Sequence, residues 1–239
     1  MNETLVVSEV FGPTVQGEGP SAGRRCMFVR LGRCNLDCAW CDTPYTWDWT
    51  GKNGVAYDPK QLVTVDVDVV IAQVIAHSPT LVVISGGEPM LQRSGLSELV
   101  LRLRERWPFM RIEIETNGTQ VPWVALDEAG CWFNVSPKLA GSGVDPERAM
   151  RPRALIALRD TGRASFKFVV GSATDWTQVC ALVDTLPIMP SSVWLMPQTA
   201  YGTAEAGVPA PVVAQWAIDA GFNYSDRLHV RLWGDERGR

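Results

Sequence analysis

Three cysteines in one short stretch are the residues of this sequence best suited to chemistry. Cys34, Cys38 and Cys41 have the spacing C-x3-C-x2-C, and a fourth cysteine is missing from the stretch. A compact loop of this kind can turn three thiolates toward one point, where they can hold three irons of a [4Fe–4S] cube. Iron–sulfur clusters that only transfer electrons normally have four thiolate ligands. The open fourth iron therefore indicates that a cofactor binds to it.

Zinc and disulfides are the other common uses of clustered cysteines. Structural zinc needs four closed ligands, and the only histidines, His77 and His229, are remote from the cysteines and complete no such set. Disulfide frameworks are typical of small secreted chains, whereas this chain has 239 residues, six cysteines and no secretory segment at its start. We therefore favour an iron–sulfur cluster and expect a cytoplasmic protein.

Charge and hydrophobicity narrow the class of partner. Lys and Arg number 22 and Asp and Glu 26, which gives a net charge of -4. Nucleic-acid binding usually depends on a basic surface that neutralises phosphates, so we expect a small-molecule substrate and no nucleic acid. No apolar run approaches the roughly 20 residues that span a bilayer, and a hydrophobic content of 46% is ordinary for a globular protein. No membrane partner is expected.

Short apolar strands must position the cysteines. Residues 26–31 are typical of a buried strand that leads into the cysteine loop, so Cys26 is expected to pack as an apolar side chain rather than to serve as a fourth ligand. Further strands are expected at 5–11, ending at Gly12-Pro13, and at 81–84, 111–115, 132–135, 165–170, 192–195 and 228–232. Helical periodicity is present at 67–75, with Thr64 or Asp66 as a cap, at 96–103 and at about 209–220.

Six or seven strands, several of them separated by helices, predict βα units and a parallel sheet in one α/β domain. Polar residues follow several strands: residues 85–89, Glu115 with Asn117, and Ser136 with Lys138. Barrels and open α/β sheets place their sites at these carboxyl ends. Each group also has a structural interpretation, as a tight turn, a solvated carboxylate or a cap.

The motifs taken together resemble a known superfamily. Cys34, Cys38, Trp40 and Cys41, with the Gly-Gly-Glu-Pro turn at 86–89, resemble the radical S-adenosylmethionine (SAM) enzymes. A longer ordered set resembles the 7-carboxy-7-deazaguanine synthase family. This set comprises Val15-Gln16-Gly17-Glu18-Gly19, Arg30, Cys41-Asp42-Thr43, Ser85-Gly86-Gly87-Glu88-Pro89, Glu115-Thr116-Asn117-Gly118 and Ser136-Pro137-Lys138, with a looser match through Lys167 to the C-terminus.

This resemblance implies a fold, cofactors and a reaction. The fold would be a single-domain partial (β/α) barrel over residues 1–239, with about six parallel strands, short N- and C-terminal extensions, and the cluster loop and ligands at the strand C-terminal ends. The cofactors would be a [4Fe–4S] cluster, SAM and Mg2+. The enzyme would convert 6-carboxy-5,6,7,8-tetrahydropterin to 7-carboxy-7-deazaguanine with release of ammonia, in queuosine and 7-deazapurine biosynthesis. Its partners would be a one-electron reductant such as flavodoxin and a second copy of the chain, as a homodimer.

The resemblance also implies roles for individual residues. The cluster ligands would be Cys34, Cys38 and Cys41, and Thr43 would bind Mg2+ through its hydroxyl, since this hard cation prefers oxygen ligands. The substrate would contact Val15, Gln16, Gly17, Arg30 and Ser85, with Arg30 able to clamp a carboxylate in a bidentate fork. SAM would contact Trp40, Cys41, Asp42, Gly87, Glu115, Ser136, Pro137, Lys138, Met196, Pro197, Gln198 and Thr199.

Some questions stay open at this stage. In some family members a C-terminal tail places a histidine and its terminal carboxylate on the pterin, and here Trp233 falls near the position of that histidine. Contacts from the C-terminus are therefore unresolved by the sequence. Two other functions also remain: another radical SAM enzyme, especially an activase of glycyl-radical enzymes, and a non-catalytic iron–sulfur or zinc module.

Overall fold

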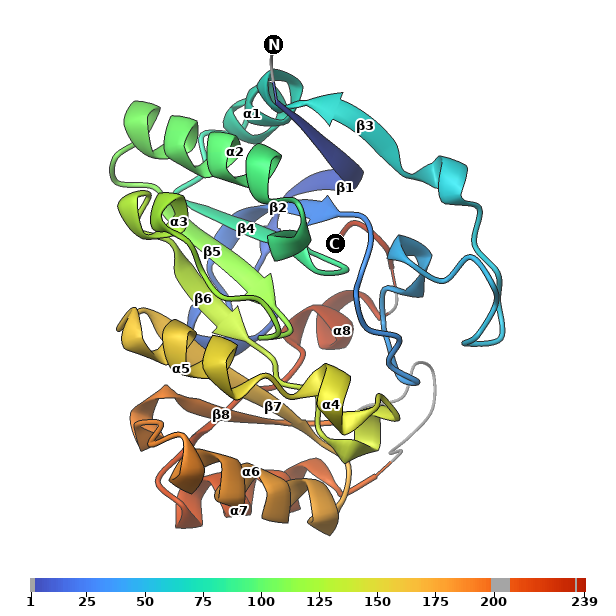
Figure 1. Ribbon diagram of the computed structural model, residues 1–239, viewed down its shortest axis with the longest axis vertical. Coiled ribbons are helices and arrows are strands. Elements are labelled where there is room, and N and C mark those ends of the chain that lie inside the picture. The colour runs from blue at the N-terminus through green and yellow to red at the C-terminus, as the bar shows by residue number, and fades with distance from the viewer. Residues whose placement is uncertain (1–2, 199–206, 235) are drawn as a thin grey trace.

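A long curved sheet organises the chain in the computed structural model (Figure 1). The structure describes residues 3–198, 207–234 and 236–239. Within these residues nine strands form one sheet in the order β3-β1-β2-β4-β5-β6-β7-β8-β9. Their bounds are β1 Thr4–Val15, β2 Arg25–Leu31, β3 Val63–Asp66, β4 Leu81–Gly86, β5 Arg111–Thr116, β6 Trp132–Val135, β7 Ala164–Val170, β8 Val193–Pro197 and β9 Asn223–Tyr224.

Parallel pairing brings the strand ends to one edge of the sheet. β2, β4, β5, β6, β7, β8 and β9 pair in parallel along the sheet, whereas β1 runs antiparallel to both β2 and β3. β4 begins with the apolar run 81–84 and is buried through Ser85, as expected for a parallel strand covered on both faces. The polar residues that follow the parallel strands therefore lie along the same edge.

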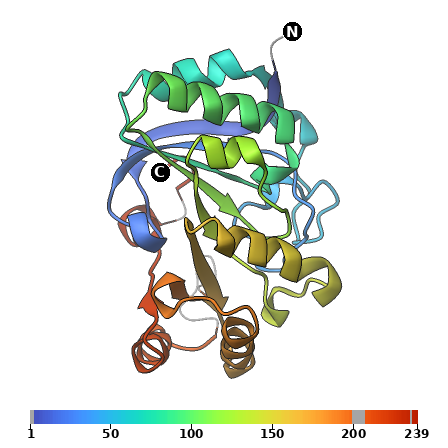
Figure 2. The same ribbon diagram turned by 60° about the vertical axis from the view of Figure 1, so that its left-hand side comes forward.

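Helices pack around this sheet, most of them on its outer face, whereas the last one, near the C-terminus, lies on the inner side (Figures 1 and 2). They are α1 Val67–Ile75, α2 Arg93–Arg106, α3 Val124–Glu128, α4 Pro146–Ala149, α5 Pro152–Asp160, α6 Ala173–Thr185, α7 Ala210–Asp219 and α8 Leu228–Trp233. The apolar stripe of α2, formed by Leu96, Leu99, Val100 and Leu103, is fully buried in the main core. No described helix is long and apolar enough to cross a membrane.

The predicted architecture is confirmed. The chain is an α/β protein with a mostly parallel sheet, and β3 and β9 form the two open edges, so the strands make a partial barrel. The helix predicted at 67–75 and the strand predicted at 132–135 have the expected bounds. The strands predicted at 81–84, 111–115, 165–170 and 192–195 are present with ends displaced by one or two residues.

Two local predictions are wrong, and a third holds in part. β1 does not stop at Gly12-Pro13 but continues to Val15, because a shift in register between Phe11 and Thr14 accommodates these residues opposite β2. Thr64, one of the two predicted caps, lies in edge strand β3. Asp66, the other, occupies the N-cap position of α1 as predicted, although its side chain makes no capping hydrogen bond.

The other error concerns the segment at 228–232. Its alternating apolar and polar residues suggested a strand, but the segment forms α8. Hydrogen bonds from the backbone N–H groups of Val230 and Arg231 to the carbonyl of Arg227 close the first turn. Its residues are half-buried or exposed, without the alternate burial that a strand packed on a core would show. The two-residue strand β9 was not predicted at all.

Candidate active site

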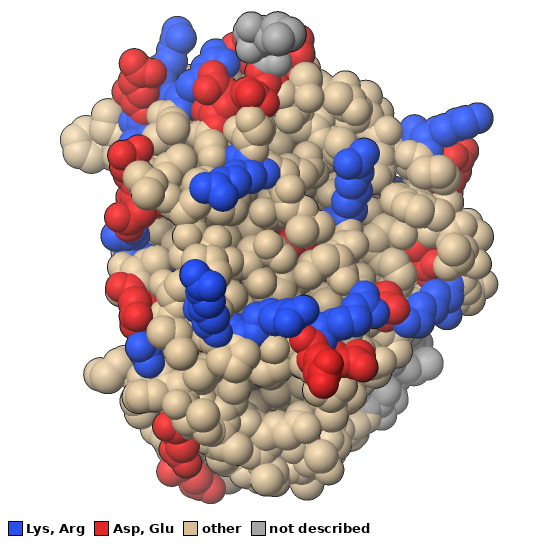
Figure 3. All heavy atoms as spheres, in the orientation of Figure 1, with Lys and Arg blue, Asp and Glu red and all other residues tan. Residues whose placement is uncertain are grey.

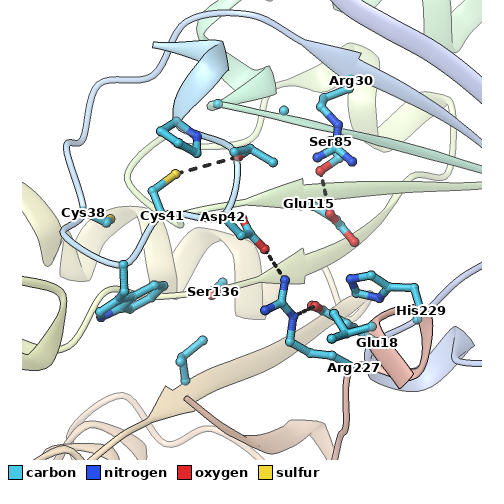
Figure 4. Close-up of a pocket in the computed structure, with 18 of the residues that line it drawn as sticks. Glu18, Arg30, Cys38, Cys41, Asp42, Ser85, Glu115, Ser136, Arg227 and His229 are labelled. Carbon is cyan, nitrogen blue, oxygen red and sulfur yellow. Dashed lines mark hydrogen bonds and ion pairs between the residues drawn. The ribbon is translucent and has the colours of Figure 1, made fainter. Parts of the chain in front are cut away.

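A cavity of about 700 Å3 lies at the carboxyl edge of the parallel strands. The cysteine loop, the ends of β2, β4, β5, β6, β7 and β8, and the C-terminal segment all contribute to its wall (Figure 4). The predicted site residues that line it are Val15, Gln16, Gly17, Arg30, Cys34, Cys38, Trp40, Cys41, Asp42, Thr43, Ser85, Gly87, Glu115, Ser136, Lys138, Met196, Pro197 and Gln198. Segments far apart in the sequence are thus gathered around one space.

Two predicted residues are not part of this lining. Pro137 is buried between Ser136 and Lys138 but does not face the cavity. Thr199 lies outside the described residues. The individual roles predicted for the lining residues remain predictions, since the geometry shows only that they surround a common space.

The three cysteines share an apolar environment beside the cavity. They pack with Leu36, Val144 and Ala149. Burial raises the pKa of all three thiols, that of Cys34 to about 12. Three nitrogen donors point at sulfur: the Leu36 N–H lies 3.4 Å and Asn117 Nδ2 4.0 Å from Cys34 Sγ, and Trp47 Nε1 lies 3.2 Å from Cys41 Sγ. Such hydrogen bonds stabilise ligating thiolates and tune cluster potentials.

This donor set fits a cluster better than a single ion. Among residues 3–198, 207–234 and 236–239, no group of three or more His, Cys, Asp or Glu side chains lies close enough to hold one metal ion. A tetrahedral zinc site needs such a group. A cube distributes its ligands over separate irons, so three thiols around one cavity suffice.

The Gly-Gly turn at the end of β4 lies against the start of the cysteine loop. Gly86 has φ +136, and a Cβ on Gly87 would come within 2.0 Å of the Arg33 carbonyl oxygen. The N–H of Gly87 donates to the Leu31 carbonyl at 3.1 Å, and the N–H of Glu88 donates to that of Arg33 at 2.9 Å. Only glycine permits this approach of two backbones, so the turn fixes where the cysteine loop begins.

Glu88 joins this turn to the next strand end. Its buried carboxylate accepts hydrogen bonds from the Thr116 hydroxyl at 3.0 Å, the Asn117 N–H at 2.7 Å and the Met90 N–H at 3.0 Å. Burial raises the pKa of Glu88 to about 6, although these hydrogen bonds oppose the rise. Asn117 in turn donates from Nδ2 to Asn35 Oδ1 at 2.9 Å. The ends of β4 and β5 are therefore tied to the cysteine loop.

Glu115 lies among residues predicted to bind the substrate. Its Oε1 accepts from Gln16 Nε2 at 3.0 Å, and its Oε2 accepts from the Ser85 hydroxyl at 2.6 Å. Figure 4 shows Arg30 and Ser85 on the same side of Glu115. Glu115 was predicted from the sequence to contact SAM, but its hydrogen bonds in the structure are with the predicted pterin residues.

Trp40 and Lys138 form a second polar region of the wall. Trp40 Nε1 donates to the Gly141 carbonyl at 2.9 Å. Lys138 Nζ lies 5.3 Å from the Trp40 ring centroid and donates to Ser136 Oγ at 3.0 Å. These contacts hold an aromatic face and an ammonium group beside the cysteines, where SAM was predicted to bind.

A chain of charges crosses the cavity wall. Asp42 Oδ2 accepts from Arg227 Nη2 at 2.7 Å, and Glu18 Oε1 accepts from Arg227 Nε at 3.3 Å (Figure 4). Glu18 also forms an ion pair with Lys167. Burial would raise the pKa of Glu18, but the charges of Lys167 and Arg227 outweigh it and lower the pKa to about 2. Glu18 therefore stays ionised. Through its ion pair with Arg227 it links the C-terminal segment to the Gln16 loop, residues 16–24 between β1 and β2.

The C-terminal residues were the main omission of the sequence prediction. His229, Gly234 and Arg237 line the cavity, whereas Trp233, the predicted counterpart of the tail histidine, does not. Burial lowers the pKa of His229. One sign of this residue was present in the sequence, since His229 is one of only two histidines in the chain. It was not assigned to the site because residues 228–232 were predicted to form a strand.

Comparisons with known proteins agree with this arrangement. The radical SAM superfamily model matches residues 29–155. A 7-carboxy-7-deazaguanine synthase of Pyrobaculum aerophilum is 36% identical over 238 residues, which cover 98% of this chain and 96% of the relative. The synthase of Bacillus subtilis is 27% identical over 252 residues, covering 100% of both chains. The crystal structure of QueE from Escherichia coli has a TM-score of 0.69 at 24% identity and 95% coverage of each chain, which shows a similar fold.

Proposed function

We infer the function of this chain from its membership of the radical SAM superfamily and, within it, of the 7-carboxy-7-deazaguanine synthase family. The chain is a radical SAM enzyme that uses a [4Fe–4S] cluster and SAM. The observation that carries this conclusion is the full-length similarity to synthases, combined with the gathering of the family's ordered motifs around one cavity. No comparable observation favours a glycyl-radical activase or a non-catalytic metal module.

The reaction converts 6-carboxy-5,6,7,8-tetrahydropterin to 7-carboxy-7-deazaguanine and ammonia. Substrate and products balance, because the two heterocycles differ by one NH3 and no net oxidant is needed. Cys34, Cys38 and Cys41 would hold the cluster beside the cavity, and the cluster with SAM would supply the radical chemistry that the reaction at C6 of the pterin needs. The work of the protein is to aim the reacting carbon and to exclude side reactions.

The cavity wall offers separate groups for the two ligands. We propose that Gln16, Ser85 and Glu115 bind the polar edge of the pterin, since their hydrogen-bonded array presents both donors and an acceptor. Arg30 would bind the substrate carboxylate. The SAM-binding residues would be those around the cysteines and the ends of β6 and β8, namely Trp40, Ser136, Lys138, Met196 and Gln198.

Thr43 is the proposed ligand of Mg2+. Thr43 lines the cavity, and its hydroxyl lies 3.8 Å from Cys41 Sγ, so it offers an oxygen ligand close to the cysteines. A hard cation at this position could polarise the substrate carboxylate and stabilise developing charge. Thr43→Val keeps the shape of the side chain and removes the oxygen. It should abolish the stimulation of turnover by Mg2+ while leaving the iron content unchanged.

An electron donor and a second copy of the chain are the proposed partners. Near the cysteine loop, the basic side chains Lys52 and Arg148 are each 49% exposed, although both pair with Asp37. Figure 3 shows basic side chains in a row across the middle of one face, with acidic ones beside it. An acidic one-electron donor such as flavodoxin would suit this mixed surface. We also infer that residues 1–239 act as one radical SAM domain with short extensions and that the enzyme forms a homodimer.

A reducing compartment such as the cytoplasm suits this chemistry. All six cysteines are free in the structure, and structural disulfides are rare where thiols are kept reduced. An open iron–sulfur cluster likewise requires protection from oxidation.

The decisive experiment is anaerobic reconstitution. The purified protein, loaded with iron and sulfide and supplied with reductant, SAM and Mg2+, should convert 6-carboxy-5,6,7,8-tetrahydropterin to 7-carboxy-7-deazaguanine, measured by chromatography and mass spectrometry. Failure to form this product with an intact cluster that cleaves SAM would leave the superfamily assignment standing and refute the proposed substrate.

A further inference from the structure

One carboxylate beside the cavity is shared by two arginines from opposite ends of the chain. Glu9, on β1, accepts from Arg30 Nε at 2.8 Å through Oε1 and from Arg237 Nε at 3.1 Å through Oε2. Arg30 belongs to β2, and Arg237 follows α8. Both arginines line the cavity. Glu9 therefore sets the distance and orientation between two guanidinium groups at the same wall.

Aromatic rings hold the two guanidinium groups in place. Arg237 Cζ lies 4.0 Å from the centroid of the Tyr45 ring, and Arg30 Cζ lies 6.0 Å from it. Arg30 also lies over Phe11, at 5.3 Å from the ring centroid. Cation–π contact orders a guanidinium through its face and leaves its N–H donors at the edge unoccupied. The donors not already bonded to Glu9 or Ser8 thus remain available to a ligand.

The unused donors and the positive charge of the two arginines favour binding of an anion. Arg30 bonds Glu9 through Nε, and none of the residues in the described ranges accepts a hydrogen bond from its Nη1 or Nη2. Arg237 donates from Nη2 to Ser8 Oγ at 3.2 Å, and its Nη1 likewise has no acceptor within those ranges. Glu9 is the carboxylate hydrogen-bonded to both guanidinium groups and offsets one of their two positive charges. Asp42 and Glu115 also act on Arg30 electrostatically. The Arg30 side chain is 16% exposed, and its Nη1 and Nη2 are not among the buried unpaired polar atoms of the described residues, so a ligand in the cavity can reach them.

We propose that Arg237 acts with Arg30 to bind the carboxylate of the pterin substrate and thereby selects a carboxylated substrate. This inference rests on the proposed function and adds a residue to it. Two arginines can each donate to one carboxylate, which gives short charge-assisted hydrogen bonds. A site built around such donors discriminates strongly against an analogue that lacks the group, because the donors are then left unpaired. Arg237 is a substrate-binding residue supplied by the segment after α8.

Ligand discrimination tests this role. The cluster-loaded protein with SAM is titrated anaerobically with 6-carboxy-5,6,7,8-tetrahydropterin and with 5,6,7,8-tetrahydropterin, which lacks the carboxylate, and the Kd of each is measured calorimetrically. Arg237→Gln should weaken binding of the carboxylated pterin by about tenfold or more and leave the Kd of the analogue unchanged. Arg237→Lys should lie between wild type and Arg237→Gln, because it keeps the charge and loses the fork.

A matched control uses a nearby arginine that faces away from the cavity. The side chain of Arg231 is 66% exposed and forms an ion pair with Asp226. It does not line the cavity. Arg231→Gln should leave both dissociation constants unchanged. Iron content and the SAM-induced change in the cluster spectrum should be the same in all variants, which excludes loss of the cluster as the cause.

Several outcomes would overturn the inference. Equal weakening of both pterins by Arg237→Gln would mean that Arg237 orders the C-terminal segment rather than reads the carboxylate. Unchanged binding of both would mean that it does not contact the substrate. If the wild type binds the carboxylated pterin but forms no deazaguanine, the proposed reaction fails while the binding data still decide the role of Arg237. If the wild type binds neither pterin, both ideas fall.

Discussion

His229 lies directly against Gly17. A Cβ on Gly17 would come within 1.9 Å of His229 Nδ1, so a larger residue cannot occupy this position without displacing the imidazole. The same two segments are joined by hydrogen bonds from the Leu228 N–H to the Gly17 carbonyl at 2.9 Å and from the Gly19 N–H to Ser225 Oγ at 2.8 Å. The C-terminal segment and the Gln16 loop therefore form one continuous wall of the cavity.

Substitution of Gly17 should damage substrate binding selectively. Gly17→Ala would push His229 out of its position and disturb the loop that carries Gln16. We expect the KM for the carboxylated pterin to rise about tenfold, since small displacements in a binding site are costly in positioning. Iron content and SAM binding should not change, because the cysteines lie on a different loop. Steady-state kinetics and iron analysis test this.

A double variant separates this clash from other effects. In Gly17→Ala with His229→Ala the imidazole is gone, and the nearest remaining contact of the new Cβ is the Cβ of residue 229, at 3.0 Å. The double variant should therefore be no worse than His229→Ala alone, a non-additivity expected of residues in contact. Strictly additive losses would show that Gly17 matters for a reason other than His229.

The cysteine assignment predicts a sharp division among the six cysteines. Alanine at Cys34, Cys38 or Cys41 should remove one iron ligand, lower the iron content and reduce turnover to background. Cys180→Ala is the control, because Cys180 lies on α6, away from the cavity, and should leave iron content and turnover as in wild type. Iron analysis, the visible absorption spectrum and product formation measure the outcome. Full activity in any of the three loop variants would refute the assignment.

The sequence was sufficient where function depends on local spacing. The cysteine loop, the Gly-Gly turn and the polar residues after β5 and β6 follow strands that are evident in the sequence, β5 as an alternation of apolar and charged residues. Parallel pairing alone therefore places them at one edge. The sequence was insufficient for residues that only the tertiary structure brings to the cavity. Arg227, His229 and Arg237 reach the cavity only because α8 turns back across the sheet, and no spacing relates them to Glu18, Gly17 or Glu9.

The error at α8 has the same origin. Leu228, Val230 and Leu232 alternate with polar residues, which favours a strand in isolation. Among the strands of the described residues none pairs with this segment. It packs against the Gln16 loop through single contacts such as the one between His229 and Gly17. Local periodicity could not reveal which partner the segment would meet.

The ion pairs of Glu18 predict how stability depends on pH. The folded-state pKa of Glu18 is lowered from 4.5 to about 2. A carboxylate with a lowered pKa stabilises the fold above its unfolded pKa, and this contribution is lost as pH falls from 4.5 through the folded value. The contribution amounts to about 3 kcal/mol at neutral pH. Urea unfolding of cluster-free protein between about pH 7 and about pH 3 should show the loss in wild type.

Glu18→Gln should lack this pH dependence and be less stable at neutral pH. The substitution removes the carboxylate paired with Lys167 and one of the carboxylates paired with Arg227, which is destabilising. The advantage of wild type over the variant should therefore shrink as the pH falls below 4.5. Asp127→Asn is the control: Asp127 pairs with Arg163 but is 67% exposed, and exposed pairs contribute about 0–1 kcal/mol. An advantage of wild type that stays constant with pH would contradict the assignment.

Glu88 predicts a link between the fold and SAM binding. Its carboxylate accepts from Thr116, Asn117 and Met90, whereas a glutamine amide would present a donor to at least one of these donors. Leaving a buried donor unsatisfied costs about 1–3 kcal/mol. Glu88→Gln should lower the free energy of unfolding by this amount and weaken SAM binding, because Asn117 would no longer hold the cysteine loop through Asn35. Urea unfolding and SAM titration of the cluster spectrum measure the two effects.

The two effects of Glu88→Gln should appear together, and Glu98→Gln serves as the surface control. Glu98 lies on α2, is 41% exposed and pairs with Arg102, so Glu98→Gln should change stability by less than about 0.5 kcal/mol and leave SAM binding intact. If Glu88→Gln destabilised the protein while SAM bound as in wild type, Glu88 would support the core alone. If SAM binding weakens together with the loss of stability, the hydrogen bonds from Asn117 to Glu88 and from Asn117 to Asn35 hold the cysteine loop in the position that SAM binding requires.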